Sequence, residues 1–163
     1  MKQILFLSIL LLCSTLTGIS NEKNDKKIRQ NEVLVNSFIE ALNAKDMDKL
    51  TSLFTDDGTY EEVCSGRFHT GKKAISAYIT ATLEGIPDSK FELVSISCSA
   101  NHAMFEWIWK GTNSVGWPAM NLPPTSKYLE LRGVSVMDIE NGRIYANRDY
   151  WDWNSFLKGI GAK

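Results

Sequence analysis

The segment KYLELRGVSVMDIENGRIYANRDYWDW, residues 127–153, decides the fold class of this chain. It consists of two long runs rich in β-branched and aromatic residues, with the alternation of apolar and polar side chains that half-buried strands show. Asn141-Gly142 separates the two runs and is a strong signal for a tight hairpin turn. We therefore predict two antiparallel strands, over residues 127–139 and 143–153.

Two further strands precede this hairpin, over residues 91–99 and 102–112, with a weaker turn signal at Ala100-Asn101 between them. Shorter β-prone stretches, 59–63 and 67–70, lie on either side of a Ser-Gly turn and predict a small hairpin. The second half of the chain is therefore expected to be an antiparallel meander.

The first half of the chain shows helical spacing instead. Five apolar residues face one side of a helix predicted over residues 26–44, namely Ile28, Val35, Phe38, Ile39 and Leu42. Asp46 predicts an N-cap for a short second helix that ends at Asp56-Asp57-Gly58, and Thr70 predicts one for a third helix that ends at Gly85. Helices followed by hairpin-linked strands indicate an α+β domain, with three N-terminal helices packed on one face of a curved, mostly antiparallel sheet.

Composition limits the class of protein. The chain has 163 residues, 44% of them hydrophobic, which suffices for one sizeable core but not for two ordinary domains. The net charge is -1 and no basic stripe runs along the sequence, so we expect no nucleic-acid partner. There is no P-loop, GxGxxG, CxxC or paired-histidine spacing, so we expect neither a cofactor nor a metal. Cys64 and Cys98 are either separate buried thiols or a disulfide formed in an oxidising compartment.

The N-terminus has the composition of a secretory signal, with an early lysine, an apolar run and then small or polar residues. The apolar run is too short to span a bilayer, so we expect no transmembrane helix. We predict an exported protein, periplasmic or secreted, with a signal peptide at 1–20, a flexible polar tether at 21–27 and the folded domain at 28–163. Cys13, at the end of the apolar run, leaves a lipid anchor as the alternative.

Several motifs resemble one known superfamily. The stretches 38–48 and 54–62 resemble the opening of ketosteroid isomerase and its nuclear-transport-factor-2-like relatives. Five later segments resemble the SnoaL-like polyketide and ester cyclases of that superfamily, namely Trp109–Thr112, Pro123–Lys127, Leu131–Gly133, Glu140–Ile144 and Tyr150–Asp152. The resemblance implies a cone in which a strongly bent sheet wraps around three helices, with an apolar pocket at the wide end.

Asp152 matches the aspartate that in SnoaL-like cyclases removes a proton from the substrate carbon. Its aromatic neighbours in sequence are expected to shield it from water and raise its pKa toward useful basicity. The alternative is that Asp152 caps the turn that follows it, an ordinary helix-start role for aspartate. On strict alternation Arg148 shares its sheet face and is expected to donate to a substrate oxygen, although an ion pair between them would lower the pKa of Asp152.

Glu62 lies where ketosteroid isomerases carry their proton-shuttling aspartate, so the resemblance implies a catalytic role. The alternative is a solvent-facing residue on a strand. The match to the steroid isomerases then fails, because Phe38 stands where they have an oxyanion-binding tyrosine and Val134 lies nearest to their protonated aspartate. Steroid isomerisation by that mechanism is therefore disfavoured.

Seven residues are predicted to line the pocket: Phe38, Tyr60, His69, Trp107, Trp109, Arg148 and Tyr150. Trp107 and Trp109 share a strand face and serve either as core packing or as aromatic walls. His69 is either a proton relay or a surface residue. The apolar loop 113–124 is expected to lie across the pocket mouth or at a dimer contact.

These residues favour a cofactor-independent cyclase or isomerase that acts by proton abstraction on a small apolar carbonyl compound. One alternative is a module that binds a small apolar or aromatic ligand without turnover. Another is a dimeric interaction domain, since the outer sheet face commonly pairs with a second copy in this superfamily. We expect the chain to form a homodimer.

Overall fold

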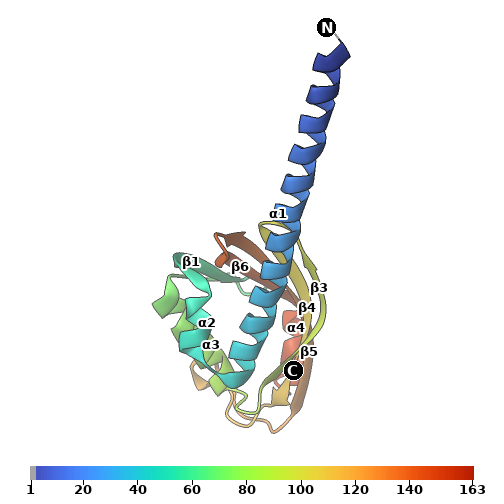
Figure 1. Cartoon of the computed structure of the whole chain (residues 1–163). Helices are drawn as coiled ribbons and strands as arrows, with labels where there is room; N and C mark the ends of the chain where they lie inside the picture. The colour runs from blue at the N-terminus through green and yellow to red at the C-terminus, as the bar shows by residue number, and fades with distance from the viewer. Residues whose placement is uncertain (1–2) are drawn as a thin grey trace.

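A computed structural model describes the backbone of residues 3–163 and the side chains of residues 22–163. The first helix, α1 (Gln3–Ala44), projects away from the domain at its N-terminal end and packs against the sheet at its C-terminal end (Figure 1). Residues 21–27, expected to be a flexible tether, are helical as part of α1. The predicted signal peptide and the lipid-anchor alternative at Cys13 lie outside the residues with described side chains. Within the described residues, no helix is long and apolar enough to cross a membrane.

Two short helices follow α1. The helix α2 (Met47–Ser52) begins at the predicted N-cap Asp46, whose carboxylate accepts a hydrogen bond of 2.8 Å from the Lys49 N–H. The helix α3 (Lys72–Glu84) ends where predicted, but its N-cap is Gly71 rather than Thr70. Gly71 has a φ of 81°, which a β-branched residue such as threonine strongly disfavours. The chain therefore enters the helix one residue later than predicted.

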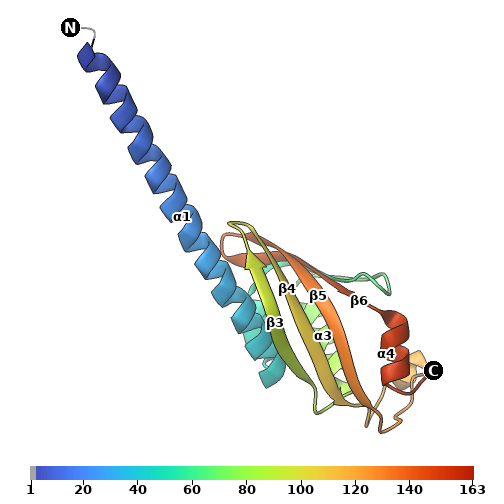
Figure 2. The same ribbon diagram turned by 90° about the vertical axis from the view of Figure 1, so that its right-hand side faces the viewer.

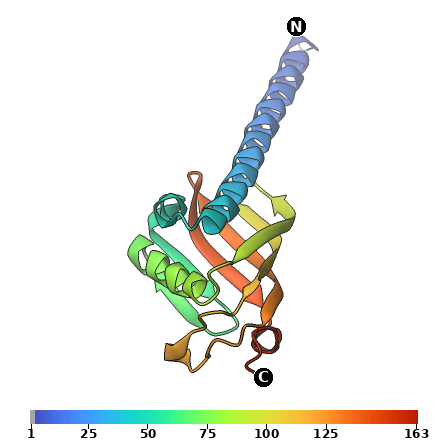
Figure 3. The ribbon, with the colours of Figure 1, turned by 90° about the horizontal axis from the view of Figure 1, so that it is seen from below.

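Six strands form one curved, unclosed sheet in the order β2-β1-β6-β5-β4-β3. Their bounds are β1 Phe54–Glu62, β2 Arg67–Thr70, β3 Lys90–Cys98, β4 His102–Thr112, β5 Tyr128–Glu140 and β6 Arg143–Trp151. All neighbours run antiparallel except β1 and β6, which are parallel. The helices α1, α2 and α3 lie on one side of the sheet (Figure 2, Figure 3), so the predicted α+β cone is confirmed.

Two strand boundaries differ from the prediction by two residues or more. β1 begins at Phe54, so Asp56-Asp57-Gly58, predicted to end the second helix, lies inside the strand where its register with β6 shifts. β6 ends at Trp151, two residues earlier than predicted, because Asp152 begins the C-terminal helix α4 (Trp153–Gly159). The chain leaves the sheet here, and α4 packs against β5.

The parity of β6 determines which of its side chains reach the interior. The inward-facing residues in its second half are Asn147, Asp149 and Trp151. Arg148 and Tyr150 point to the outer face instead, where Tyr150 is 45% exposed. Arg148 donates a hydrogen bond of 2.8 Å from Nη1 to Asp138 on β5 and does not approach Asp152. The expectation that Arg148 and Tyr150 line the pocket is therefore wrong.

The core lies between the helices and the inner face of the sheet. β4 alternates strictly, and its inward residues are the expected Ala103, Phe105, Trp107 and Trp109. Phe38 of α1 packs edge-on against Phe105, with 6.1 Å between ring centroids, and also touches Phe54. Phe38 is thus a core residue rather than the pocket wall that it was predicted to be.

Candidate functional site

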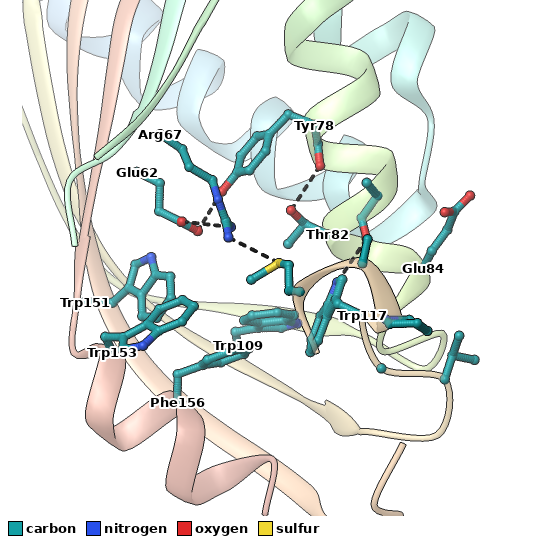
Figure 4. A pocket seen from close by; sticks show the side chains of 16 residues that line it. Glu62, Arg67, Tyr78, Thr82, Glu84, Trp109, Trp117, Trp151, Trp153 and Phe156 are labelled. Carbon is teal, nitrogen blue, oxygen red and sulfur yellow. Dashed lines mark hydrogen bonds and ion pairs between the residues drawn. The ribbon is translucent and has the colours of Figure 1, made fainter. Parts of the chain in front are cut away.

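One end of the cone holds a cavity of about 480 Å³ (Figure 4). Its walls come from β1, β2, α3, β4, the loop 113–124, the end of β6 and α4. The aromatic members of the wall are Tyr78, Trp109, Trp117, Trp151, Trp153 and Phe156. A volume of this size and an apolar lining with few polar groups are typical of sites for small organic ligands.

Glu62 is the buried carboxylate of this cavity, with only 5% of the residue exposed. The Tyr78 hydroxyl donates a hydrogen bond of 2.6 Å to Oε1, and Arg67 Nη1 donates one of 3.2 Å to Oε2. The Ser65 hydroxyl also donates to Oε2. The alternative of a solvent-facing Glu62 is therefore wrong. Burial is the largest cause that raises the pKa of Tyr78, and the charge of Glu62 adds to it, so Tyr78 acts as a donor.

A second carboxylate lies beside Glu62 across the parallel strand pair. Asp149 on β6 is the register partner of Glu62 on β1. Both residues line a smaller inner cavity of about 40 Å³. This inner cavity adjoins the outer one, and some residues line both. Tyr78, Trp109 and Trp151 belong to both walls. The inner cavity is large enough for ordered water beside the two carboxylates.

Three donors surround the carboxylate of Asp149. Ser135 Oγ and Asn147 Nδ2 donate to Oδ1 at 2.6 and 2.8 Å, and the Tyr60 hydroxyl donates to Oδ2. Asp149 is only partly buried as a residue, yet its carboxylate is enclosed by these groups. This burial raises the pKa of Asp149, the three hydrogen bonds oppose the shift, and the charge of Glu62 adds to it. Burial also raises the pKa of Tyr60 well above its ordinary value.

Phe156 of α4 is the centre of the aromatic wall. Its ring centroid lies 5.3 Å from that of Trp151, 5.4 Å from those of Trp153 and Trp117, and 6.0 Å from that of Trp109. Trp109 donates its indole N–H to Ser89 Oγ at 2.9 Å. Trp117 donates its own to the Ala81 carbonyl at 3.0 Å. These contacts fix the wall at distances typical of paired aromatic rings.

The loop 113–124 forms the outer side of the cavity, which confirms one of its two expected positions. The backbone N–H of Gly116 donates to the Gly85 carbonyl at 3.0 Å, which ties the loop to the end of α3. A Cβ at Gly85 would lie 2.1 Å from the Trp117 ring, so the glycine makes room for this indole. Arg67 Nη2 contacts the Met120 sulfur at 3.1 Å and connects the loop to the polar group around Glu62.

Asp152 does not line the cavity. It is exposed and serves as the N-cap of α4, accepting a hydrogen bond of 2.5 Å from the Ser155 N–H. Hydrogen bonding by the side chain of Ser155, and then by its backbone N–H, is the main reason why the pKa of Asp152 is lowered. The expected upward shift of the pKa is therefore wrong, and the alternative role as a helix cap is what the structure contains.

The other predicted pocket residues divide between the two cavities and the surrounding core. Tyr60 and Trp107 line only the inner cavity, and Trp109 lines both. His69 stacks on Tyr78 with 4.2 Å between ring centroids and lines neither cavity, and burial lowers its pKa. It therefore supports the tyrosine that holds Glu62.

The sequence singles out Trp117 only as part of the apolar loop, and Trp151 and Trp153 only as neighbours of Asp152. It gives no role to four further residues of the site, namely Arg67, Tyr78, Asp149 and Phe156. For Asp149 and Trp151 the alternation of β6 misleads, because counting in twos from the inward Ile144 selects Arg148 and Tyr150. A register shift at Tyr145 reverses the alternation and brings Asp149 and Trp151 to the inner face. The roles of Arg67 and Tyr78 depend on how β2 and α3 pack against Glu62, which no pattern along the chain encodes.

The arrangement of metal-ligating side chains and the state of the two cysteines can be described for residues 22–163. Within residues 22–163 no group of three His, Cys, Asp or Glu is placed to hold a metal ion. Cys64 and Cys98 are free thiols and do not form the disulfide that was one alternative. Burial raises the pKa of Cys64 to about 12, which makes it a poor nucleophile.

Comparisons with known proteins place this geometry in a family context. The family model of the SnoaL-like domain matches residues 35–147. No curated protein matches the sequence. A protein from Jannaschia sp. CCS1 described as a SnoaL-like polyketide cyclase has a similar structure, with a TM-score of 0.75 and 16% identity over 83% of this chain and 94% of that one.

Two other solved structures show how varied the proteins with this fold are. AclR from Streptomyces galilaeus, described as a hydroxylase, has a TM-score of 0.72 and 15% identity over 83% of this chain and 98% of its own. A protein with a ketosteroid isomerase-like fold from Catenulispora acidiphila, in complex with trimethylamine, has a TM-score of 0.68 and 20% identity over 78% and 92% of the two chains. At these identities the likeness establishes the fold alone.

Proposed function

Since this chain belongs to the SnoaL-like domain family, we propose that it is a cofactor-independent enzyme that abstracts a proton from a small apolar carbonyl compound and so initiates cyclisation or isomerisation. The observation that carries the proposal is the position of Glu62. Its carboxylate is the buried polar group of an aromatic cavity, and it is held by Tyr78 and Arg67. General bases require this combination of fixed geometry and restricted access to water.

The proposed reaction begins with transfer of a proton from the carbon next to the substrate carbonyl to Glu62. The electron pair of the broken C–H bond forms a C=C bond, and the π pair of the carbonyl moves to its oxygen. The enolate then takes a proton at another carbon, or its carbon attacks a second carbonyl and the resulting alkoxide takes the proton. Glu62 regains its charge in either case, so no external oxidant or reductant is needed.

Asp152 has no place in this reaction. Its exposed carboxylate is occupied by the Ser155 N–H, and its lowered pKa makes it a weaker base. Asp149 is better placed for a supporting role, since it adjoins Glu62 and its raised pKa favours the form that carries a proton.

The proposal can be tested without knowing the natural substrate. The full-length chain is incubated in D₂O with 2-tetralone, an enolisable apolar ketone, and deuterium incorporation next to the carbonyl is followed by NMR. Because it removes the base, Glu62→Gln is expected to slow the enzyme-dependent exchange roughly 10²- to 10⁴-fold. Asp152→Asn is the control and is expected to leave exchange unchanged. Exchange by Glu62→Gln at the wild-type rate would show that Glu62 is not the base.

A second candidate function is a module that binds its ligand without turnover. It is favoured by the hydrogen bonds of Tyr60 and Tyr78, because both hydroxyls are occupied by carboxylates and neither is free to hold an enolate oxygen. The trimethylamine complex of the Catenulispora relative suggests an organic cation as one such ligand, since tryptophan faces attract alkylammonium groups. Binding of 2-tetralone or trimethylamine by the full-length chain, with no exchange above the buffer rate, would favour this function.

We also propose that the protein is exported and that it forms a homodimer. Export follows from the signal-like residues 1–20, with lipid attachment at Cys13 as the alternative, and mass spectrometry of the mature N-terminus tests both. A homodimer is supported by the outer face of the sheet, where Met104 is 51% exposed and Tyr150 lies on a neighbouring part of the same face. Light scattering of the purified chain measures its oligomeric state.

A further inference from the structure

The tryptophans that line the two cavities differ in whether a protein group accepts a hydrogen bond from the indole N–H. Trp107, Trp109 and Trp117 each donate their indole N–H to another residue. Trp151 and Trp153 differ, because within residues 22–163 no acceptor lies in hydrogen-bond range of their indole nitrogens. Neither nitrogen is sealed from solvent, so each is open to an acceptor that enters the cavity.

Trp151 is the better placed of these two. It lines both the outer and the inner cavity, as Glu62 does, whereas Trp153 lines only the outer one. Figure 4 shows Trp151 on the same side of the cavity as Glu62, with its nitrogen on the edge nearer to that carboxylate. Its N–H therefore belongs to the region where the two cavities meet and where the proposed base lies.

Arg67 adds donors on the opposite side of Glu62. A guanidinium group has five N–H donors, and those of Arg67 that are engaged contact Glu62 and the Met120 sulfur. The Arg67 side chain is 35% exposed, so its remaining donors have room for a ligand. Glu62 is thus an acceptor flanked by unused donors of Trp151 and Arg67.

We propose that Trp151 Nε1–H, together with Arg67, binds the carbonyl oxygen of the ligand and holds the charge that develops there when Glu62 takes the proton. This inference rests on the proposed function and names its substrate class, an enolisable ketone or ester with a flat apolar body. The two tyrosines cannot take this role because they already donate to the carboxylates. Trp151 is therefore the group that determines whether a ligand with a carbonyl is preferred to one without.

The test compares two probes of the same shape with the full-length chain. One is 2-acetylnaphthalene, which has a carbonyl acceptor, and the other is 2-ethylnaphthalene, which has none. Equilibrium dialysis gives the ratio of their affinities. We expect the wild type to prefer the carbonyl probe, and Trp151→Phe to reduce that preference roughly three- to tenfold, because one hydrogen bond to the ligand is lost.

Trp117→Phe is the matched control. Trp117 lines the outer cavity, but its N–H is already bound to the Ala81 carbonyl, so this change should alter the affinity for both probes by the same factor. An equal loss of preference in Trp117→Phe and Trp151→Phe would contradict the assignment to Trp151. Near-ultraviolet circular dichroism establishes that each variant is folded.

The wild-type measurement distinguishes a failure of this inference from a failure of the proposed function. The measurement remains decisive even if Trp151→Phe does not fold. If both probes bind with equal affinity, the donor role of Trp151 and Arg67 is wrong while the ligand cavity remains. If neither probe binds, the proposed function fails as well. A preference for the carbonyl probe that falls only in Trp151→Phe supports the inference.

Discussion

The floor and the rim of the cavity are built from different kinds of structure. The floor is formed by the parallel strands β1 and β6, which place Glu62 and Asp149 side by side and surround each with hydrogen-bond donors. The rim is formed by the loop 113–124 and the seven-residue helix α4, which contribute mainly apolar and aromatic side chains. One region has fixed polar geometry, and the other has aromatic packing on short elements.

This difference suggests that the floor and the rim have different tasks. The backbone of paired strands cannot move without breaking ladder hydrogen bonds, and side-chain hydrogen bonds hold the two carboxylates, so the floor is suited to positioning reacting atoms. A loop tied to α3 by a few backbone bonds can shift at lower cost, so the rim is suited to admitting ligands and excluding water. A change in the floor should therefore act first on stability, and a change in the rim first on binding.

The largest expected effect is that of Gly133→Ala on β5, the strand that pairs with β6 of the floor. A Cβ at Gly133 would lie 2.2 Å from the Trp107 ring, and that indole is held by a hydrogen bond of 2.9 Å to Ser135 within the sheet. Because neither partner can move freely, we expect a loss of about 1–3 kcal/mol in the free energy of unfolding. Urea unfolding followed by circular dichroism measures it.

Gly85→Ala introduces the same kind of steric clash at the rim. Its Cβ would lie 2.1 Å from the Trp117 ring, and Gly85 has a φ of -64°, which alanine adopts without strain. We expect Trp117 and its loop to move, with a smaller loss of stability than in Gly133→Ala and a clear drop in affinity for 2-acetylnaphthalene. Equal losses of stability in the two variants would show that the rim is as rigid as the floor.

The fold was largely predictable because it depends on patterns that are local in the sequence. The Asn141-Gly142 turn and the alternation in β4 are of this kind, and both determine elements found as predicted. Two of the misplaced boundaries, the start of α3 and the start of β1, have local causes that composition hides. Gly71 adopts a positive φ, and Asp56-Asp57-Gly58 lies at an irregularity inside β1 instead of in a turn. Turn-forming residues inside a strand are easily taken for its end.

The site was less predictable because a strand side chain changes face with every residue. The sequence predicts Asp152 as the base, whereas the inward positions of β6 belong to Asp149 and Trp151, because a register shift at Tyr145 reverses the alternation of the strand. The resemblance to a family located the right end of the right strand, but the start of α4 at Asp152 removed this residue from the sheet. Arg67 and Tyr78 depend on contacts between distant segments, which no pattern along the chain encodes.

The smallest effect we expect distinguishes the same two aspartates by pH. Asp149, in the floor, has a raised pKa, so its contribution to stability is unfavourable at high pH. The contribution improves as pH falls through the pKa of the folded state toward the pKa of the unfolded state, about 3.9. Asp152, at the rim, has a lowered pKa, so its contribution to stability is fully present above the pKa of the unfolded state, about 3.9. It is lost as pH falls through the lower pKa of the folded state. The two carboxylates should therefore leave opposite signatures in thermal melts recorded from pH 3 to pH 8.

Asparagine variants isolate the two signatures, because each removes one titration and keeps the shape of the side chain. In Asp149→Asn the gain in melting temperature on mild acidification should shrink, and in Asp152→Asn the loss at the acidic end should shrink. The effect at Asp152 is the weaker one, since an exposed cap is screened by water and salt. If Asp149→Asn instead follows the wild-type pH profile throughout, its carboxylate does not carry the burial that places it in the floor of the site.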